Sequence, residues 1–341
     1  MPVTLKDIAA RVGLSVNSVS RALRDKDDIA IDTRRRVKAV AQELGYRPNM
    51  NARSLVLKQS FTIGVAVTEL NNPVRMDFCE RLRQLAEQDG YRLISAGISL
   101  HQTRKDLDTI SDLLSRGVDG LVLGYLAGPL DDQPIGKILA DCERTSLPVT
   151  IFGSPETTLA DYAFIDFRDS CHRLTCHMLD QGIVPVGFFP KHPETGFSDE
   201  RSQGYLQAMT ERGMKKQAKL WPVKITDSAL TAAAKAMKSF LARHKQPPQG
   251  IIASNDLLAM SIISTLRDHG FQVPADVAVA SFDNIEIGQY FTPPLTTMGL
   301  GNDLFAAQIW ELLTHRIANK KRTPLRKLHL RHELIIRKSC P

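Results

Sequence analysis

The chain of 341 residues is long enough for two or three domains, and its 43% hydrophobic and 24% charged residues are typical of a globular protein. A formal net charge of +7 favours a polyanionic partner, and no stretch approaches the roughly eighteen apolar residues of a membrane span. The five scattered cysteines argue against a disulfide framework. Because the start MPVTLKDIAA lacks an apolar signal core, we expect a cytoplasmic protein with reduced thiols.

Residues 1–47 predict an all-helical domain with three helices. Five of the six predicted ends carry a residue that favours starting or stopping a helix. These residues are Thr4 and Gly13 for the first helix, Ser15 for the start of the second, and Asp32 and Gly45 for the third. Asp7 completes a capping box with Thr4. The second helix has its apolar positions at Val16, Val19 and Leu23.

The first two helices and the glycine between them form the helix-turn-helix pattern. Its geometry needs a small residue in the first helix where the second crosses it, a turn residue free to take positive φ, and an apolar residue in the second helix that packs on the first. Ala9, Gly13 and Val19 stand at these three positions. The second helix of such a pair lies in the DNA major groove. Asparagine can bridge adenine and arginine can bridge guanine there. The alternative is a three-helix bundle whose Ser/Asn face is merely solvated.

Charge distribution favours the DNA-binding interpretation. Residues 1–60 contain twelve Lys or Arg and six Asp or Glu, so nearly all the excess charge of the chain lies there. Residues 48–59 follow as a linker, because Pro48 breaks the preceding helical pattern. Asn49 or Asn51 could cap a short helix within it, but a helix this short is not stable alone.

From residue 60 to 341 short apolar runs alternate with amphipathic stretches, which is typical of parallel βαβ units. The runs are FTIGVAV, RLISAGI, GLVLGY, PVTIFG, AFIDF, VGFFP, GIIAS and VAVASFD. The length favours two α/β subdomains with a cleft at the carboxyl ends of the strands. We predict the first subdomain at about 60–160 and 292–320, and the second at about 161–291 and 321–341.

The sequence resembles the lactose-repressor/galactose-repressor (LacI/GalR) family of bacterial transcriptional regulators over essentially the whole chain. The motifs are TLKDIAARVGLSVNSVSRAL, TRRRVKAVAQELGYRPNMNARSL, IGVAV, VDGLVL, ERSQGY, SND, VAVASFDN and PPLTT. The resemblance implies a helix-turn-helix head and a periplasmic-binding-protein-like α/β body of two parallel-sheet subdomains. It also implies a two-fold dimer on a pseudo-palindromic operator. The end LIIRKSCP lacks the extra helix that makes the lactose repressor a tetramer, so we expect a homodimer.

The resemblance also assigns DNA contacts. It implies that Val16 and Asn17 read operator bases and that Arg21 stands at the far end of the reading helix. Leu55 matches a leucine that wedges into the minor groove, where an apolar wedge unstacks a base step and bends the duplex. The alternative for Leu55 is a core residue. The full predicted set is Thr4, Ser15, Val16, Asn17, Ser18, Arg21, Asn49, Ala52, Arg53 and Leu55.

In the body, the resemblance implies that Arg201 grips sugar hydroxyls, that Asp283 accepts hydrogen bonds from them, and that Asn255 is a pocket amide. The alternatives are helix capping for Asn255 and a strand-end turn for Asp283.

The stretch NNPVRMDF departs from the family, in which many members carry aromatic residues that stack on the ligand. Val74 and Arg75 replace those aromatics, and Gly153 stands where many members have a polar residue. Arg75 therefore predicts a pocket that accepts negative charge, such as that of a sugar acid or sugar phosphate. Alternatively, Arg75 faces a dimer interface or solvent. Tyr125 either takes over the stacking role or lies between the subdomains.

Together these features predict a sequence-specific DNA-binding transcriptional repressor, not an enzyme, whose operator affinity is controlled by a small carbohydrate effector. Its expected partners are double-stranded DNA, the effector and a second copy of the chain, and no membrane. A purine- or nucleoside-responsive regulator, or one that needs a corepressor, is the alternative. No dinucleotide-binding, P-loop or nucleophile-elbow motif is found, which argues against an enzyme. We also expect no cofactor. CHRLTCH permits only a two-ligand clip, so we favour an ordinary helix over a metal site.

Overall fold

The computed structural model describes residues 3–46, 59–99, 103–191, 196–225, 228–319 and 323–341. Of residues 196–199 and 302 it describes the backbone alone. The chain divides into two compact units, one ending at Ser60 and the other beginning at Phe61. Most of the predicted linker, 48–59, lies outside the described residues, so its conditional helix stays a prediction.

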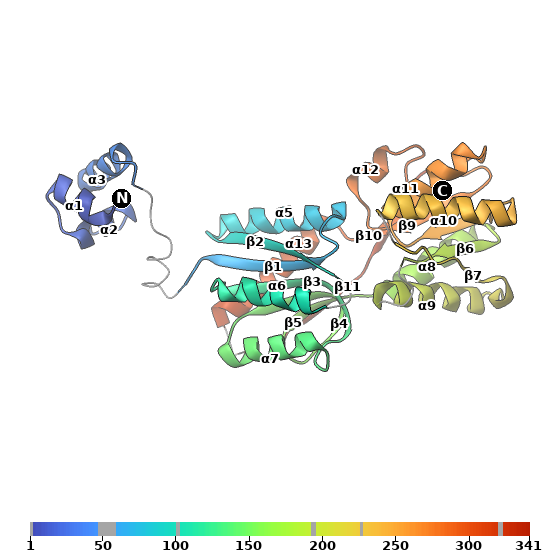
Figure 1. Ribbon diagram of the computed structural model, residues 1–341, viewed down its shortest axis with the longest axis horizontal. Helices are drawn as coiled ribbons and strands as arrows, with labels where there is room; N and C mark the ends of the chain where they lie inside the picture. Colours follow the sequence, from blue (N-terminus) through green and yellow to red (C-terminus); the bar gives the residue numbers. More distant parts are fainter. Residues whose placement is uncertain (1–2, 47–58, 100–102, 192–195, 226–227, 320–322) are drawn as a thin grey trace. The chain divides into compact units, whose positions relative to one another are not determined.

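The first unit is a small three-helix bundle (Figure 1). Its helices are α1 (Leu5–Val12), α2 (Val16–Leu23) and α3 (Ile31–Glu43). Gly13 ends α1 at φ 69°, a left-handed conformation that glycine adopts without a steric penalty. Contrary to the prediction, α3 begins before Asp32. The carboxylate lies in the first turn, where it complements the helix dipole.

The second unit contains two six-stranded sheets, each covered by helices on both faces (Figure 1). The first sheet has the order β11-β5-β4-β3-β1-β2, and the ladders between its neighbours are parallel. Its strands are β1 (Thr62–Thr68), β2 (Arg92–Ile98), β3 (Gly120–Pro129), β4 (Val149–Glu156), β5 (Asp161–Ile165) and β11 (Lys327–Leu330). Its helices are α5 (Pro73–Gln88) and α13 (Asn302–Asn319) on one face, and α6 (Arg104–Ser115) and α7 (Pro134–Thr145) on the other.

The second sheet has the order β12-β10-β9-β8-β6-β7, with β12 antiparallel to β10. Its strands are β6 (Val186–Phe189), β7 (Lys219–Leu220), β8 (Gly250–Ala253), β9 (Ala278–Phe282), β10 (Thr296–Gly299) and β12 (Glu333–Ile335). Helices α8 (Phe167–Asp180) and α9 (Gly196–Glu211) cover one face, and α10 (Ala229–His244) and α11 (Asp256–Asp268) cover the other. A 3₁₀ turn at Lys215–Gln217 and the short helix α12 (Glu286–Tyr290) complete the unit.

The chain crosses between the sheets after β5, after β10 and after β11. The predicted subdomain boundaries are wrong in detail, because 161–165 and 327–330 pair in the first sheet and 296–299 pairs in the second. Apolar patterning identifies a strand but not the sheet that receives it, which depends on long-range pairing. In the part of the chain that is described, no helix is long and apolar enough to cross a membrane.

Candidate functional site

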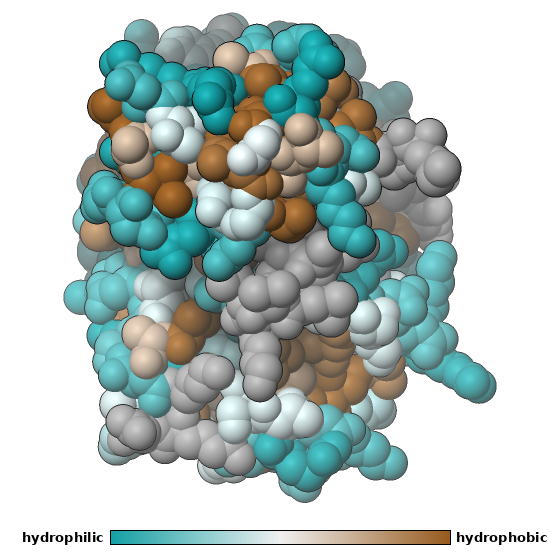
Figure 2. Space-filling view, turned by 90° about the vertical axis from the view of Figure 1, so that its left-hand side faces the viewer, coloured by the Kyte–Doolittle hydropathy of each residue, from teal (hydrophilic) through white to brown (hydrophobic). Residues whose placement is uncertain are grey.

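The exposed face of α2 carries the residues predicted to read DNA. The side-chain oxygen of Ser15 accepts a hydrogen bond from the Ser18 amide at 3.0 Å, so Ser15 caps the helix as predicted. Val19 and Ala22 are buried, whereas Val16 is 41% exposed and Asn17 is exposed. Val16 therefore does not belong to the buried stripe that the spacing predicted, and it is free to contact a partner. On the face that Figure 2 views, hydrophobic residues appear among hydrophilic ones.

Arg21 and Thr4 already have partners within this unit. The guanidinium of Arg21 pairs with the carboxylate of Asp28, and this hydrogen bond lowers the pKa of Asp28. The amide and hydroxyl of Thr4 donate to Asp7 Oδ2 at 2.7 and 2.8 Å, which makes Thr4 a capping residue of α1. Reading of bases by Arg21 requires it to leave Asp28. Asn49, Ala52, Arg53 and Leu55 lie outside the described residues.

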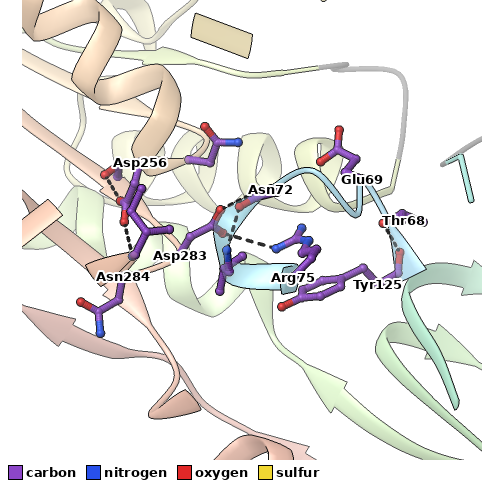
Figure 3. Close-up of polar contacts among 12 residues, drawn as sticks. Thr68, Glu69, Asn72, Arg75, Tyr125, Asp256, Asp283 and Asn284 are labelled. Carbon is purple, nitrogen blue, oxygen red and sulfur yellow. Dashed lines mark hydrogen bonds and ion pairs between the residues drawn. The ribbon is translucent and has the colours of Figure 1, made fainter. Parts of the chain in front are cut away.

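In the second unit, the guanidinium of Arg75 lies against two residues from different elements (Figure 3). Its ζ-carbon is 3.4 Å from the ring centroid of Tyr125, and its Nη1 is 3.8 Å from Asp283 Oδ1. Arg75 lies on α5 of the first sheet and Asp283 follows β9 of the second. Because Arg75 is only 7% exposed, it does not face solvent, which was one of its alternatives. Tyr125 stacks against this guanidinium.

The Asp283 side chain is hydrogen-bonded to a residue of the first sheet, and the Asp283 backbone has an unusual conformation. Asn72 Nδ2 donates to Asp283 Oδ2 at 3.0 Å, and Asp283 itself has φ 111°. Non-glycine residues rarely adopt this conformation, and it is retained where the surroundings fix it. A pocket of about 650 Å³ opens beside these residues, and its lining includes Val74 and Asn284, the chain neighbours of Arg75 and Asp283.

Asp256 fixes the loop that carries Asp283. Its Oδ1 accepts from the hydroxyls of Ser281 at 2.5 Å and Thr297 at 2.7 Å, and its Oδ2 accepts from the Ile285 amide at 2.8 Å. Burial, with the charge of Asp283, raises the pKa of Asp256 to about 7, although these donors oppose the shift. This role of Asp256 was not predicted from the sequence. Its position immediately after the capping Asn255 was the only available signal.

Arg201, on α9, is enclosed by two aromatic rings. Its ζ-carbon is 4.6 Å from the ring centroids of Phe167 and Phe282, and the residue is 7% exposed. Its Nε is buried without a hydrogen-bond partner, and among the described residues no carboxylate pairs with it within 4 Å. Burial lowers the pKa of Arg201, Asp283 opposes this shift and Arg75 adds to it. Arg201 is thus a buried cation with unused donor capacity.

Asn255 caps α11, because its Oδ1 accepts from the Leu258 amide at 2.9 Å. The residue is 6% exposed, so the structure shows the capping role, and its role as a pocket amide stays a prediction.

The CHRLTCH segment lies on α8. Cys171 is buried in the core and burial raises its thiol pKa to about 12, while His172 Nε2 lies 2.6 Å from Glu211 on α9. Cys176 Sγ is 3.9 Å from the His172 ring. Within the described ranges, no three His, Cys, Asp or Glu side chains are grouped to hold a metal ion.

Gly204 allows α9, and with it Arg201, to approach α8. A Cβ on Gly204 would lie 2.1 Å from the backbone oxygen of Arg168, which cannot move aside easily. We therefore expect Gly204→Ala to lower the free energy of unfolding by about 1–3 kcal/mol, as overpacking does. Denaturant unfolding measures this loss. The exposed neighbour Gln203 is the control, because Gln203→Ala should cost less than about 0.5 kcal/mol. Equal stability of the two variants would contradict the close approach.

Two family models match the chain. Bacterial regulatory proteins of the lacI family match residues 4–49, and a periplasmic binding protein-like domain matches residues 175–340. The HTH-type transcriptional repressor PurR of Photobacterium profundum is 31% identical over 98% of each chain. The repressor of the same name from Vibrio campbellii is 28% identical over 98% of this chain and 97% of that one.

Solved structures match the fold. The Lac repressor dimer bound to operator and the anti-inducer ONPF has a TM-score of 0.84 at 23% identity, covering 100% of this chain and 99% of that one. A complex of the transcriptional regulator CelR with cellobiose has a TM-score of 0.68 at 24% identity, covering 99% of each chain. These likenesses confirm the predicted helix-turn-helix head and two-sheet α/β body.

Proposed function

Because the chain belongs to the lacI family of bacterial regulatory proteins, we propose that it is a transcriptional repressor whose operator affinity depends on a small effector bound where its two sheets meet. The recognition helix is α2, which inserts its exposed Val16 and Asn17 into the major groove. Arg21 exchanges Asp28 for a base or phosphate on binding. Phosphate contacts from the basic first unit provide the salt-dependent part of the affinity.

The repressor acts as a homodimer that reads two half-sites. Exposed apolar side chains on the second unit support this proposal. Met76 on α5 is 59% exposed, and Ile287 and Tyr290 on α12 are 57% and 74% exposed. The start of α5 and α12 line one pocket and so lie near each other. A second copy of the chain would remove these side chains from water.

The observation that carries the effector proposal is the buried guanidinium of Arg201, whose Nε has no hydrogen-bond partner. A buried cation of this kind is stabilised by an acceptor from outside the chain. Asp283, which acts electrostatically on Arg201 and accepts a hydrogen bond from Asn72, would offer its carboxylate oxygens to hydroxyl groups of the effector. A carbohydrate with an acidic group meets both requirements.

A purine or nucleoside is the second candidate. The Tyr125 ring stacks on a planar guanidinium at 3.4 Å, and a planar base could take the same place. The curated relatives that are called PurR also favour this candidate.

The effector can change operator affinity only if it binds one arrangement of the two sheets more tightly than the other. The effector then acts as an inducer if that arrangement is the DNA-free one, and as a corepressor otherwise.

Two measurements on the full chain test the proposal. Selection from randomised pseudo-palindromic duplexes should recover a common half-site, and recovery of no common sequence would overturn the repressor function. A thermal-shift panel then compares neutral sugars, sugar acids, sugar phosphates and purines, because a ligand of the native state raises the melting temperature. The active compound should also change the Kd of the selected duplex. A compound that raises the melting temperature but leaves that Kd unchanged is not the effector.

A further inference from the structure

Residues 69–75 connect β1 to α5 and reach from the first sheet to the second. β1 ends at Thr68, and Asn72 caps α5, because its side-chain oxygen accepts a hydrogen bond from the Val74 amide at 3.1 Å. Pro73 occupies the first helical position, which its fixed φ suits. This short turn places residues 69–75 at the carboxyl edge of the first sheet. We call them the bridging segment.

Three polar contacts join the bridging segment to the second sheet. Glu69 pairs with Lys191, which follows β6. Asn72 Nδ2 donates to Asp283 Oδ2 at 3.0 Å, and Arg75 Nη1 lies 3.8 Å from Asp283 Oδ1 (Figure 3). Asp283 follows β9, so the contacts reach two different strands of the second sheet.

An apolar side chain of the bridging segment also belongs to the second sheet. Val74 is 6% exposed and packs in a buried cluster whose other described members come from the second sheet, its helices and its loops. Phe189, at the end of β6, and Ile285, after β9, are two of them. Separation of the two sheets would expose this side chain to water, which is unfavourable.

The contact between Arg75 and Asp283 is shielded from water. Both side chains are 8% exposed, and the ring centroid of Tyr125 lies 3.4 Å from the ζ-carbon of Arg75. Tyr125 has φ 59° and lies where the register of β3 with β4 shifts. A buried ion pair of this kind depends on both partners, because removing one leaves the other charge without compensation.

We propose that the bridging segment holds the two sheets together when no effector is bound. Every contact that carries this proposal is made by side chains of the chain itself, so the joined arrangement needs no ligand between the sheets. The proposal concerns the free protein, and its test uses neither an operator nor an effector. Its failure would therefore leave the repressor function standing.

On the basis of the proposed function, the bridging segment also distinguishes the two candidate effectors. Tyr125 is 7% exposed and its ring is covered by the Arg75 guanidinium, so a planar base can stack there only by displacing Arg75. Such an effector would weaken the contact between the sheets. A sugar acid held by Arg201, on α9, would leave the bridging segment in place.

Acetylation of lysines by a succinimidyl ester, read by mass spectrometry, tests the proposal on the full chain after exhaustive dialysis. The Lys191 side chain is 12% exposed and paired with Glu69, whereas Lys224 is exposed. Lys191 can then react only when the sheets separate, so we expect it to react at least about tenfold more slowly than Lys224. Equal rates at the two lysines would overturn the proposal.

Two substitutions remove one contact from opposite sides. Arg75→Ala changes the first sheet and Asp283→Ala changes the second, and each leaves a buried charge that separation of the sheets returns to water. Neither residue is the ion-pair partner of Lys191. We nevertheless expect each substitution to raise the acetylation rate of Lys191 by at least about fivefold, because the sheets separate more often. Unchanged rates in both variants would overturn the proposal.

Arg81→Ala is the matched control. It removes the same charge from the same helix, but Arg81 pairs with Asp77 on α5 and Asp303 on α13, both of which belong to the first sheet. The rate at Lys191 should stay at the parent value. An equal rise in this variant would show general loosening of α5 and would overturn the proposal. The rates in the parent chain decide the matter even where a variant does not fold.

Discussion

Replacing Asp161 by alanine is expected to lower the free energy of unfolding of the second unit by about 3–5 kcal/mol, because it leaves a buried arginine without its counter-charge. The Asp161 side chain is fully buried, and it accepts hydrogen bonds from Arg316 Nε at 2.8 Å and Arg316 Nη2 at 2.6 Å. It also accepts from the Arg326 amide at 2.7 Å. The carboxylate thus ties β5 to α13 and to the approach to β11.

Chemical denaturation measures this loss, and an exposed ion pair provides its control. Glu311 pairs with Arg326 at 3.1 Å, but its side chain is 68% exposed, so Glu311→Ala should cost less than about 1 kcal/mol. The double variant Asp161→Leu with Arg316→Met removes both charges and should recover part of the stability. Similar losses for Asp161→Ala and Glu311→Ala would show that Arg316 finds compensation elsewhere.

Asn17→Ala is expected to weaken binding to the selected operator by about 1–3 kcal/mol and to relax the preference at one base pair of each half-site. Asn17 is exposed on α2, next to the capping Ser15, so its truncation should leave the fold intact. Fluorescence anisotropy with the operator and with its single-base variants measures both effects. A uniform loss over all duplexes would instead make Asn17 a phosphate contact.

Arg21→Ala provides a second comparison within α2. In the free protein the Arg21 guanidinium is paired with Asp28. Its contribution to the free energy of DNA binding is therefore only the difference between a DNA contact and this ion pair. We therefore expect Asp28→Asn to strengthen operator binding several-fold and Arg21→Ala to weaken it. Arg144→Ala on the other unit is the control and should leave operator affinity unchanged.

Residue patterns predicted the parallel core of the second unit well. The apolar runs at β1, β3, β4, β6, β8 and β9 are buried strands because both faces of each sheet are covered by helices. The strands that were not predicted are short or lie near sheet edges. β7 has two residues, and β11 has exposed residues at two of its four positions, so neither produces a continuous apolar signal.

The candidate site was predicted less completely. Arg75 was predicted as a site residue because it stands where an aromatic residue is expected. Its contacts with Asp283 and Tyr125 were not predicted, because they join segments that are far apart in the chain. Asn72, Glu69 and Lys191 follow strands of different sheets, and no local pattern relates them. Their roles become visible only when the two sheets are assembled.

The crossings between the sheets have a consequence for synthesis of the chain. The first sheet receives α13 and β11, and the second receives β12, all from the last forty or so residues. The buried Ser339 Oγ accepts from the Thr296 amide and donates to the Val279 carbonyl, so the second sheet also depends on the end of the chain. Neither sheet can be completed while its last strands remain inside the ribosome. The three-helix head has a core of its own and leaves the ribosome first, so it can fold before either sheet is complete.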